Sequence, residues 1–265
     1  MSQTTENAAS GSTNPSRPKG LANLVNHVKA HKIEVGMWAT RILTIWLAAF
    51  GYFMPIFSSF MGDPTACYYK SLMASAATSA LRLHQRLPRV QLTREFAAQL
   101  ILEDSAHYLF FAVIFIYASG PITMALLPVL LFAVLHSASY SLTLLDALGQ
   151  PNDWWGAKFL ISIVELQSRN ILRMISFSEI FLMPMTVVYL FSGRTWLVVP
   201  LVYYRFLGLR YTSRRNPYTR AVFYELRLGL EETASHPNMP VFVQNLIRKF
   251  VMMVSQFAPV QGVQS

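Results

Sequence analysis

Cysteine is nearly absent from this sequence, and charged residues are scarce. The single cysteine among the 265 residues, Cys67, excludes an internal disulfide and a cluster of thiolate metal ligands. Only 13% of the residues are charged, which is about half of the fraction that soluble domains carry. Because 53% of the residues are hydrophobic and the mean hydropathy is +0.36, the composition is typical of a membrane protein.

Recognisable catalytic motifs are also missing. The sequence contains no nucleophile elbow, phosphate loop, zinc-binding helix or deaminase signature. One set of metal-ligand types remains, because Glu103 and His107 share a helix face and His136 follows in a later segment. Acidic residues are common where helices begin, and buried histidines usually bond a backbone group. We therefore expect no metal, no cofactor and no enzymatic activity.

The first 20 residues lack an apolar run and are rich in Ser, Thr, Asn, Pro and Gly. This composition predicts a disordered cytosolic tail without a signal peptide. In residues 21–34, the apolar side chains of Leu21, Leu24, Val25 and Val28 fall on one helical face. This pattern predicts an amphipathic helix that lies on the membrane surface.

Three pairs of apolar segments occupy most of residues 35–212, and a tight turn with glycine joins each pair. The segments are 42–62 with 66–81, 94–117 with 122–145, and 175–191 with 196–209. Basic residues collect in the connections on the opposite side, such as residues 82–94, and mark that side as cytosolic. The pattern predicts an all-α multi-pass membrane domain of three helical hairpins, about six apolar helices, with both termini in the cytosol.

Some of these segments are short for a membrane span. Residues 66–81 form a helix of about 24 Å, whereas the hydrocarbon core is roughly 30 Å thick. Pro55 is expected to kink the first span. Short hairpins would occupy more area in the cytosolic leaflet and favour curved membrane. Six ordinary spans packed as a compact bundle are the alternative.

Arginine alternates with tyrosine and phenylalanine in residues 203–227. Guanidinium groups bind phosphate with two donors, and tyrosine suits the headgroup layer. We predict cytosolic amphipathic helices in residues 213–265, with a second surface helix at residues 240–257. The expected contacts with lipid headgroups or partners are Arg210, Arg214, Arg215, Arg220, Arg248 and Lys249. The net charge of +9 lies between apolar segments, so anionic lipid rather than nucleic acid is the expected partner.

One carboxylate lies inside an apolar segment. Glu179 comes about one turn after the start of residues 175–191, and a charge there costs a few kcal/mol unless it is paired. Arg173, Arg205 and His136 are the candidate partners. A structural ion pair that fixes helix packing and a proton relay are the two interpretations.

Five stretches resemble a known membrane protein family. They are TSALRLHQRLP at residues 78–88, ILEDSAHY at 101–108, PVLLFAVLHSASY at 128–140, EIFLMP at 179–184 and RYTSRRNPYTR at 210–220. The sequence resembles the transmembrane protein 33 family, called Krüppel homolog 2 in insects, which includes pore-membrane proteins of yeast. The resemblance extends over roughly residues 35–259.

This resemblance implies residence in the endoplasmic reticulum membrane and the nuclear envelope. It also implies association with reticulon-type proteins and nuclear pore components, roles in tubule shaping and pore distribution, and a link to the unfolded-protein response. The residues leave two alternative functions open. A channel, a transporter or its regulatory subunit would have a polar cavity that joins His107, His136, Glu179 and Arg205. A lipid-handling protein would have an acyl-sized groove at Arg210, Arg214 and Arg215.

Overall fold

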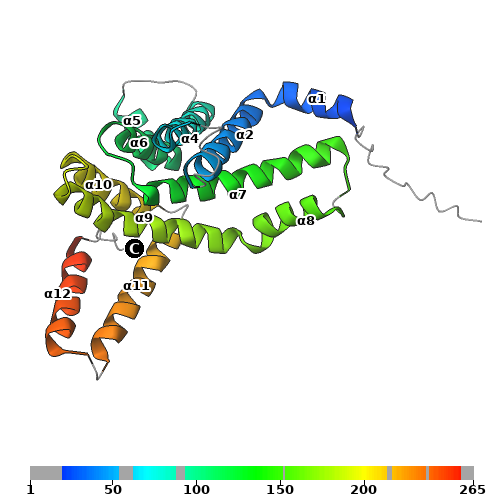
Figure 1. The fold of residues 1–265 in the computed structure, drawn as a ribbon. Coiled ribbons are helices and arrows are strands. Elements are labelled where there is room, and N and C mark those ends of the chain that lie inside the picture. Colours follow the sequence, from blue (N-terminus) through cyan, green and yellow to red (C-terminus); the bar gives the residue numbers. More distant parts are fainter. Residues whose placement is uncertain are drawn as a thin grey trace, which may run out of the picture.

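The computed structural model describes residues 20–53, 62–87, 93–151, 153–213, 217–236 and 239–257. Its helices, in chain order, are α1 (Leu21–Ala30), α2 (Lys32–Ile45), η1 (Trp46–Phe53), α4 (Pro64–Arg86), α5 (Arg94–Leu102), α6 (Asp104–Tyr117), α7 (Thr123–Leu148), α8 (Trp155–Ile161), η3 (Ser162–Leu166), α9 (Ser168–Phe191), α10 (Val198–Thr212), α11 (Tyr218–Ser235) and α12 (Val241–Phe257) (Figure 1). In these ranges the regular structure is helical apart from one isolated bridge between Ser119 and Thr195. The prediction of an all-α protein is confirmed.

Several helices are long and apolar enough to cross a membrane. Among the described residues these are Lys32–Phe53, Thr123–Leu148 and Ser168–Phe191. The pair α5 and α6, which bends by 83° between the two helices, gives a fourth candidate if it forms one span. A helical membrane protein is therefore supported. The arrangement as three hairpins stays a prediction, because α10 has only 15 residues and α4 is not among these candidates.

Local chemistry explains where the helices begin and end. The carboxylate of Asp63 accepts a hydrogen bond from the Ala66 N–H at 3.1 Å, and Pro64 is the first residue of α4. Gly193 has φ of +69° in the turn after α9, a conformation that favours glycine. The predicted turns at residues 62–65 and 192–195 thus have the residues that such turns need. Pro55 and Arg89 lie outside the described residues.

Two of the glycine turns meet at one end of the molecule. The Gly120 N–H donates to the Arg194 carbonyl at 2.9 Å, and the Trp196 N–H donates to the Ala118 carbonyl at 3.2 Å. A Cβ atom on Gly120 would lie 3.3 Å from the Arg194 carbonyl oxygen, so the close approach favours glycine. The turns at residues 119–123 and 192–195 therefore hold α6, α7, α9 and α10 together at this end.

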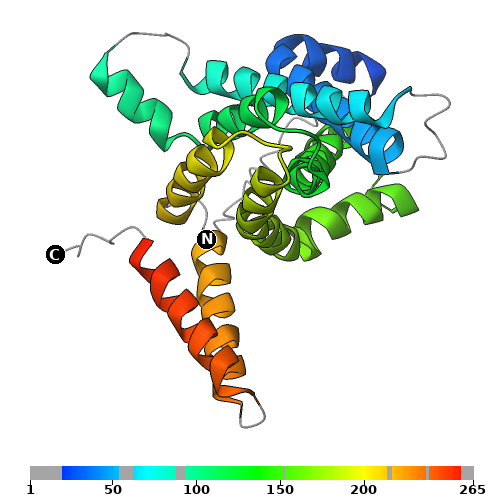
Figure 2. The same cartoon turned by 60° about the vertical axis from the view of Figure 1, so that its left-hand side comes forward.

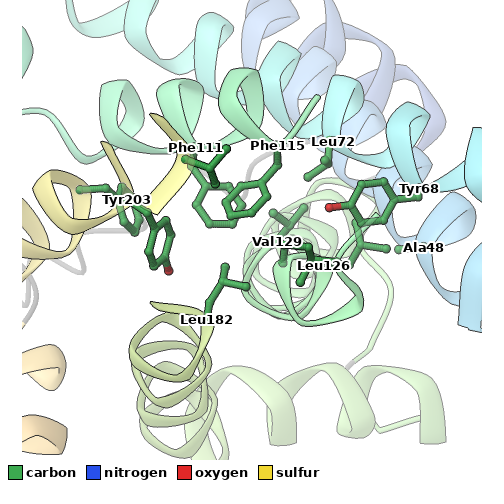
Figure 3. Packing of buried hydrophobic residues seen from close by; sticks show 13 residues of the cluster. Ala48, Tyr68, Leu72, Phe111, Phe115, Leu126, Val129, Leu182 and Tyr203 are labelled. Atoms are coloured by element: carbon green, nitrogen blue, oxygen red, sulfur yellow. The ribbon is translucent and has the colours of Figure 1, made fainter. Parts of the chain in front are cut away.

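A core of aromatic and aliphatic side chains joins helices from the whole body. Figure 3 shows Phe111 and Phe115 of α6 beside Tyr203 of α10, with Leu126 of α7 and Leu182 of α9 close to them. The rings of Phe111 and Phe115 are 4.7 Å apart between centroids. Because α4 contacts both α2 and α6, and α7 contacts α2 and α9, helices that are distant in sequence form one packed unit.

Helices α11 and α12 pack against each other and project away from this body (Figures 1 and 2). We call them the C-terminal hairpin. It is attached where α11 contacts α9, and the Arg173 and Glu225 side chains form an ion pair of 2.7 Å between these two helices. Helix α1, predicted to lie on the membrane surface, contacts α7, and the Asn23 side chain donates to the Ala147 carbonyl.

Candidate functional site

A cluster of ionic and phenolic side chains is buried where α6, α9 and α10 meet. Arg210 Nε donates to Glu179 Oε2 at 3.2 Å, and Arg210 Nη1 donates to Asp104 Oδ1 at 3.4 Å. The Tyr108 hydroxyl donates to Glu179 Oε1, and the Tyr203 hydroxyl donates to the Glu179 carbonyl at 2.8 Å. We call these five residues the ionic cluster. Glu179 is 0% exposed and Arg210 is 1% exposed.

Helical periodicity places these side chains in the interior. On α10, the buried residues Tyr203, Phe206, Leu207 and Arg210 are spaced as one helix face. On α9, Glu179 lies in the buried face that also contains Ile175 and Leu182. The two buried faces turn toward each other, so the cluster follows from the register of both helices.

The structure corrects the predicted partners of Glu179, which were Arg173, Arg205 and His136. The carboxylate bonds Arg210 and Tyr108, whereas Arg205 is exposed on another face of α10. Arg205 lies five residues from Arg210, so the two side chains leave the helix in directions about 140° apart. Arg210 is buried, although the sequence places it in the run of arginines predicted to contact headgroups or partners. The spacing of seven residues from Tyr203 to Arg210, two helical turns, is the signal that identifies the buried arginine.

The ionic cluster can fix three helices in one arrangement. Its guanidinium carries two ion pairs, and the centre of that group lies 5.2 Å from the Tyr108 ring, within the range of a cation–π contact. Charges buried in this way are tolerated only when they are paired and hydrogen-bonded. The geometry agrees with a structural ion pair, the first of the two interpretations of Glu179.

The possible metal ligands lie apart. Glu103 forms an ion pair with Arg86 at 2.7 Å, and His107 Nε2 bonds the Ile101 carbonyl at 2.6 Å. His136 stacks on the Phe132 ring of the same helix. Across the described ranges, no three His, Cys, Asp or Glu side chains gather as they would around a metal ion.

A cavity of about 310 Å³ adjoins the ionic cluster, and four arginines line it. They are Arg41 of α2, Arg82 and Arg86 of α4, and Arg210 of α10. His136 also lines this cavity, and a second hollow of about 280 Å³ shares Arg41, Arg82, Arg86 and His136 with it. We call the first of these the basic cavity. Neither Arg41 nor Arg82 was selected as a site residue from the sequence.

The basic residues predicted to contact headgroups lie in different environments. Arg220 is half-buried on α11, and Arg248 and Lys249 are exposed on α12. Arg214 and Arg215 lie outside the described residues. Helix α12 turns Val243 and Ile247 inward, and leaves Phe242, Leu246 and Phe250 exposed at 77%, 56% and 50%. The apolar side chains of this helix therefore form a half-buried stripe and an exposed stripe.

Comparisons with known proteins cover nearly the whole chain. The family described as Transmembrane protein 33/Nucleoporin POM33 matches residues 16–260. The chain is 45% identical to Krueppel homolog 2 of Drosophila melanogaster over 238 residues, which are 90% of this chain and 83% of the relative. It is 43% identical to Transmembrane protein 33 of Homo sapiens over 247 residues, 93% of this chain and 98% of the relative. No solved structure matches the chain.

Proposed function

Because this chain belongs to the Transmembrane protein 33/Nucleoporin POM33 family, we propose that it organises the membranes of the endoplasmic reticulum and nuclear envelope. Its C-terminal hairpin inserts the exposed stripe Phe242, Leu246 and Phe250 into the cytosolic leaflet. The body of the protein anchors the hairpin to the bilayer. The protein acts without catalysis. It changes the shape of the membrane and determines which proteins gather there.

The exposed stripe of α12 is the observation that carries this proposal. Three large apolar side chains follow one another at intervals of four residues. The exposed Lys249 flanks this stripe, about 60° from Leu246 around the helix axis, whereas the exposed Arg248 is about 160° from Leu246. Apolar side chains beside basic ones are typical of helices that lie in the membrane interface, where the basic groups attract anionic lipid. A helix inserted into one leaflet expands that leaflet and favours curvature.

The proposed partners rest on the family. One of its names is a nucleoporin, which supports nuclear pore components as partners and a role in pore distribution. Reticulon-type proteins, tubule shaping and a link to the unfolded-protein response are proposed on the resemblance described above. In the proposed topology both termini are cytosolic, so the C-terminal hairpin faces the cytosolic leaflet.

A channel, a transporter or its regulatory subunit has less support. The basic cavity is lined by His136, but His107, Glu179 and Arg205 are not among its lining residues. The four side chains that were expected to line a polar pathway therefore do not come together in the basic cavity. A lipid-handling role has a specific observation in its favour, the basic cavity itself, which is developed below.

The test is a change in membrane shape. We would reconstitute the full chain at a fixed protein-to-lipid ratio into vesicles that contain anionic lipid, and measure vesicle diameter by cryo-electron microscopy. Phe250→Asp should return the vesicles to the diameter of protein-free vesicles, because burying a phenylalanine contributes about 1.5–3 kcal/mol and the new carboxylate opposes insertion. Ser255→Asp adds the same charge at an exposed position of α12 and is the matched control.

A second measurement distinguishes insertion from docking onto the protein body. An environment-sensitive fluorophore on Leu246→Cys, with Cys67→Ala, should shift to shorter wavelength in vesicles and lose this shift with Phe250→Asp. The proposal would be contradicted if Phe250→Asp changed the vesicle diameter as much as the unaltered protein does. It would also be contradicted if the fluorophore on the unaltered hairpin showed no shift to shorter wavelength in vesicles.

A further inference from the structure

Arg41 is a buried charge in the middle of a candidate membrane span. It lies nine residues after the start of Lys32–Phe53, about 14 Å along the helix axis. Its exposed fraction is 9%, and no hydrogen bond or ion pair to Arg41 occurs within the described part of the chain. An ionisable side chain in such a position is costly, and in membrane proteins it commonly marks a functional site.

Arg41 does not stand alone, because folding brings other basic side chains to it. Arg82 and Arg86, one turn apart on α4, line the same two hollows as Arg41. Arg86 already pairs with Glu103, and Arg210 with Glu179 and Asp104. Positive groups placed together repel one another unless an anion lies between them. Four arginines and one carboxylate, Asp104, are among the residues that line the basic cavity, so its lining carries an excess of positive charge. An anion from outside the chain would neutralise this excess beside Arg41.

The remaining walls of the basic cavity indicate what else the ligand carries. Val129, Phe132 and Leu172 from α7 and α9 give one side an apolar lining. Thr44 and Ser79 add hydroxyl groups near the arginines. The volume of about 310 Å³ is at the small end of the roughly 300–1,000 Å³ that ligand pockets span. It suits a headgroup with the first part of a chain rather than a whole lipid.

We propose that the basic cavity binds the phosphate group of an anionic phospholipid, with Arg41 and Arg82 as its main contacts. Guanidinium binds phosphate oxygens with two parallel hydrogen bonds, which makes arginine the residue suited to this group. The cavity lies between α2, α7 and α9, which are all candidate spans, so the apolar part of the ligand has hydrocarbon beside it. A phosphate monoester from solution has the same anionic chemistry, and the experiment separates the two sources.

The experiment uses the full chain in a neutral detergent, with native mass spectrometry to measure bound phosphatidic acid. Arg41→Gln should weaken binding about tenfold or more, since it removes one charge-assisted contact with the phosphate. Arg41→Lys keeps the charge and should retain part of the affinity. Arg169→Gln removes an exposed arginine of α9 that is not part of the cavity lining, and should bind as the unaltered protein does.

Arg82→Gln is the second cavity variant, because Arg82 is only half-buried and its loss endangers folding less. Arg82→Gln should also weaken binding about tenfold. Bound phosphatidic acid should raise the midpoint of thermal unfolding of the unaltered protein, but not that of Arg41→Gln or Arg82→Gln. Equal affinity in all four variants, or an equal loss with Arg169→Gln, would overturn the proposal, because binding would then be diffuse attraction to the surface.

Competition identifies the source of the phosphate. Displacement of phosphatidic acid by glycerol phosphate, but not by phosphatidylcholine, supports the anion site and assigns it to a soluble phosphate ester. Resistance to glycerol phosphate at the same concentration supports the lipid. This inference does not depend on the proposed membrane-shaping function, because it concerns the body of the protein and leaves α12 unchanged.

Discussion

Two arginine–glutamate pairs of this protein have similar chemistry and opposite surroundings. In the ionic cluster, Arg210 Nε lies 3.2 Å from Glu179 Oε2, and the two side chains are 1% and 0% exposed. In the C-terminal hairpin, Arg227 Nε lies 2.7 Å from Glu231 Oε1, and the side chains are 57% and 44% exposed. The hydrogen bond to Glu231 raises the pKa of Arg227. The shorter contact is thus the exposed one.

The difference shows that burial decides the importance of an ion pair. In water, the gain from an exposed pair is largely offset by the entropy of holding two long side chains, and by screening. In the interior, the loss of one partner leaves a charge without compensation. Arg227 and Glu231 join two turns of one helix, whereas Arg210 and Glu179 join α10 to α9. The body therefore depends on its charges, and the hairpin does not.

The largest effect is expected for Glu179→Gln. This change removes the negative charge beside Arg210 and keeps the size of the side chain, so the guanidinium stays buried with the partly exposed Asp104 as its remaining carboxylate. We expect the free energy of unfolding, measured by titration with SDS in mixed micelles, to fall by about 3–5 kcal/mol.

A double variant decides whether the charge pair causes that loss. Arg210→Gln combined with Glu179→Gln removes both charges, so the two changes together should cost clearly less than the sum of the single changes. Additive costs would mean that the two side chains act independently, and the contrast between the interior and the hairpin would then not rest on charge.

A smaller effect is expected for Tyr203→Phe. The Tyr203 hydroxyl donates to the Glu179 carbonyl at 2.8 Å, and the side chain is 2% exposed. Removing this neutral hydrogen bond should cost about 0.5–1.5 kcal/mol in the same SDS titration. Phe206→Leu, a change of the same buried face without a hydrogen bond, is the control for packing. A cost as large as that of Glu179→Gln would mean that hydrogen bonding, and not charge, holds the ionic cluster together.

Hydropathy was sufficient to predict the helical class and the positions of the turns. The apolar runs at residues 122–145 and 175–191 correspond to α7 and α9. Gly120 marks the turn that precedes α7, and Gly193 marks the turn that follows α9. These features depend on residues that are close in sequence. Six spans were predicted from the same runs, and the three or four candidate spans found among the described residues support only the coarser statement.

The ionic cluster and the basic cavity depend on contacts that are distant in sequence. The choice between Arg205 and Arg210 as the partner of Glu179 requires the rotation of α10 about its axis, which packing against α6 and α9 determines. In the sequence, Arg41 directly precedes the first apolar segment, residues 42–62, and its position there does not indicate a buried site. Only the contacts of α2 with α4 and α7 bring Arg41, Arg82 and His136 into one cavity.

The ion pair between Arg173 and Glu225 separates burial from distance in sequence. It joins α9 to α11 across 52 residues, yet its side chains are 52% and 51% exposed. If burial decides, Arg173→Gln should lower the free energy of unfolding by only about 0.2–1 kcal/mol in the SDS titration. Arg227→Gln, within one helix, is the matched exposed control and should leave the titration unchanged. A loss with Arg173→Gln that approaches that of Glu179→Gln would show that attachment of the C-terminal hairpin to the body, rather than burial, makes an ion pair important here.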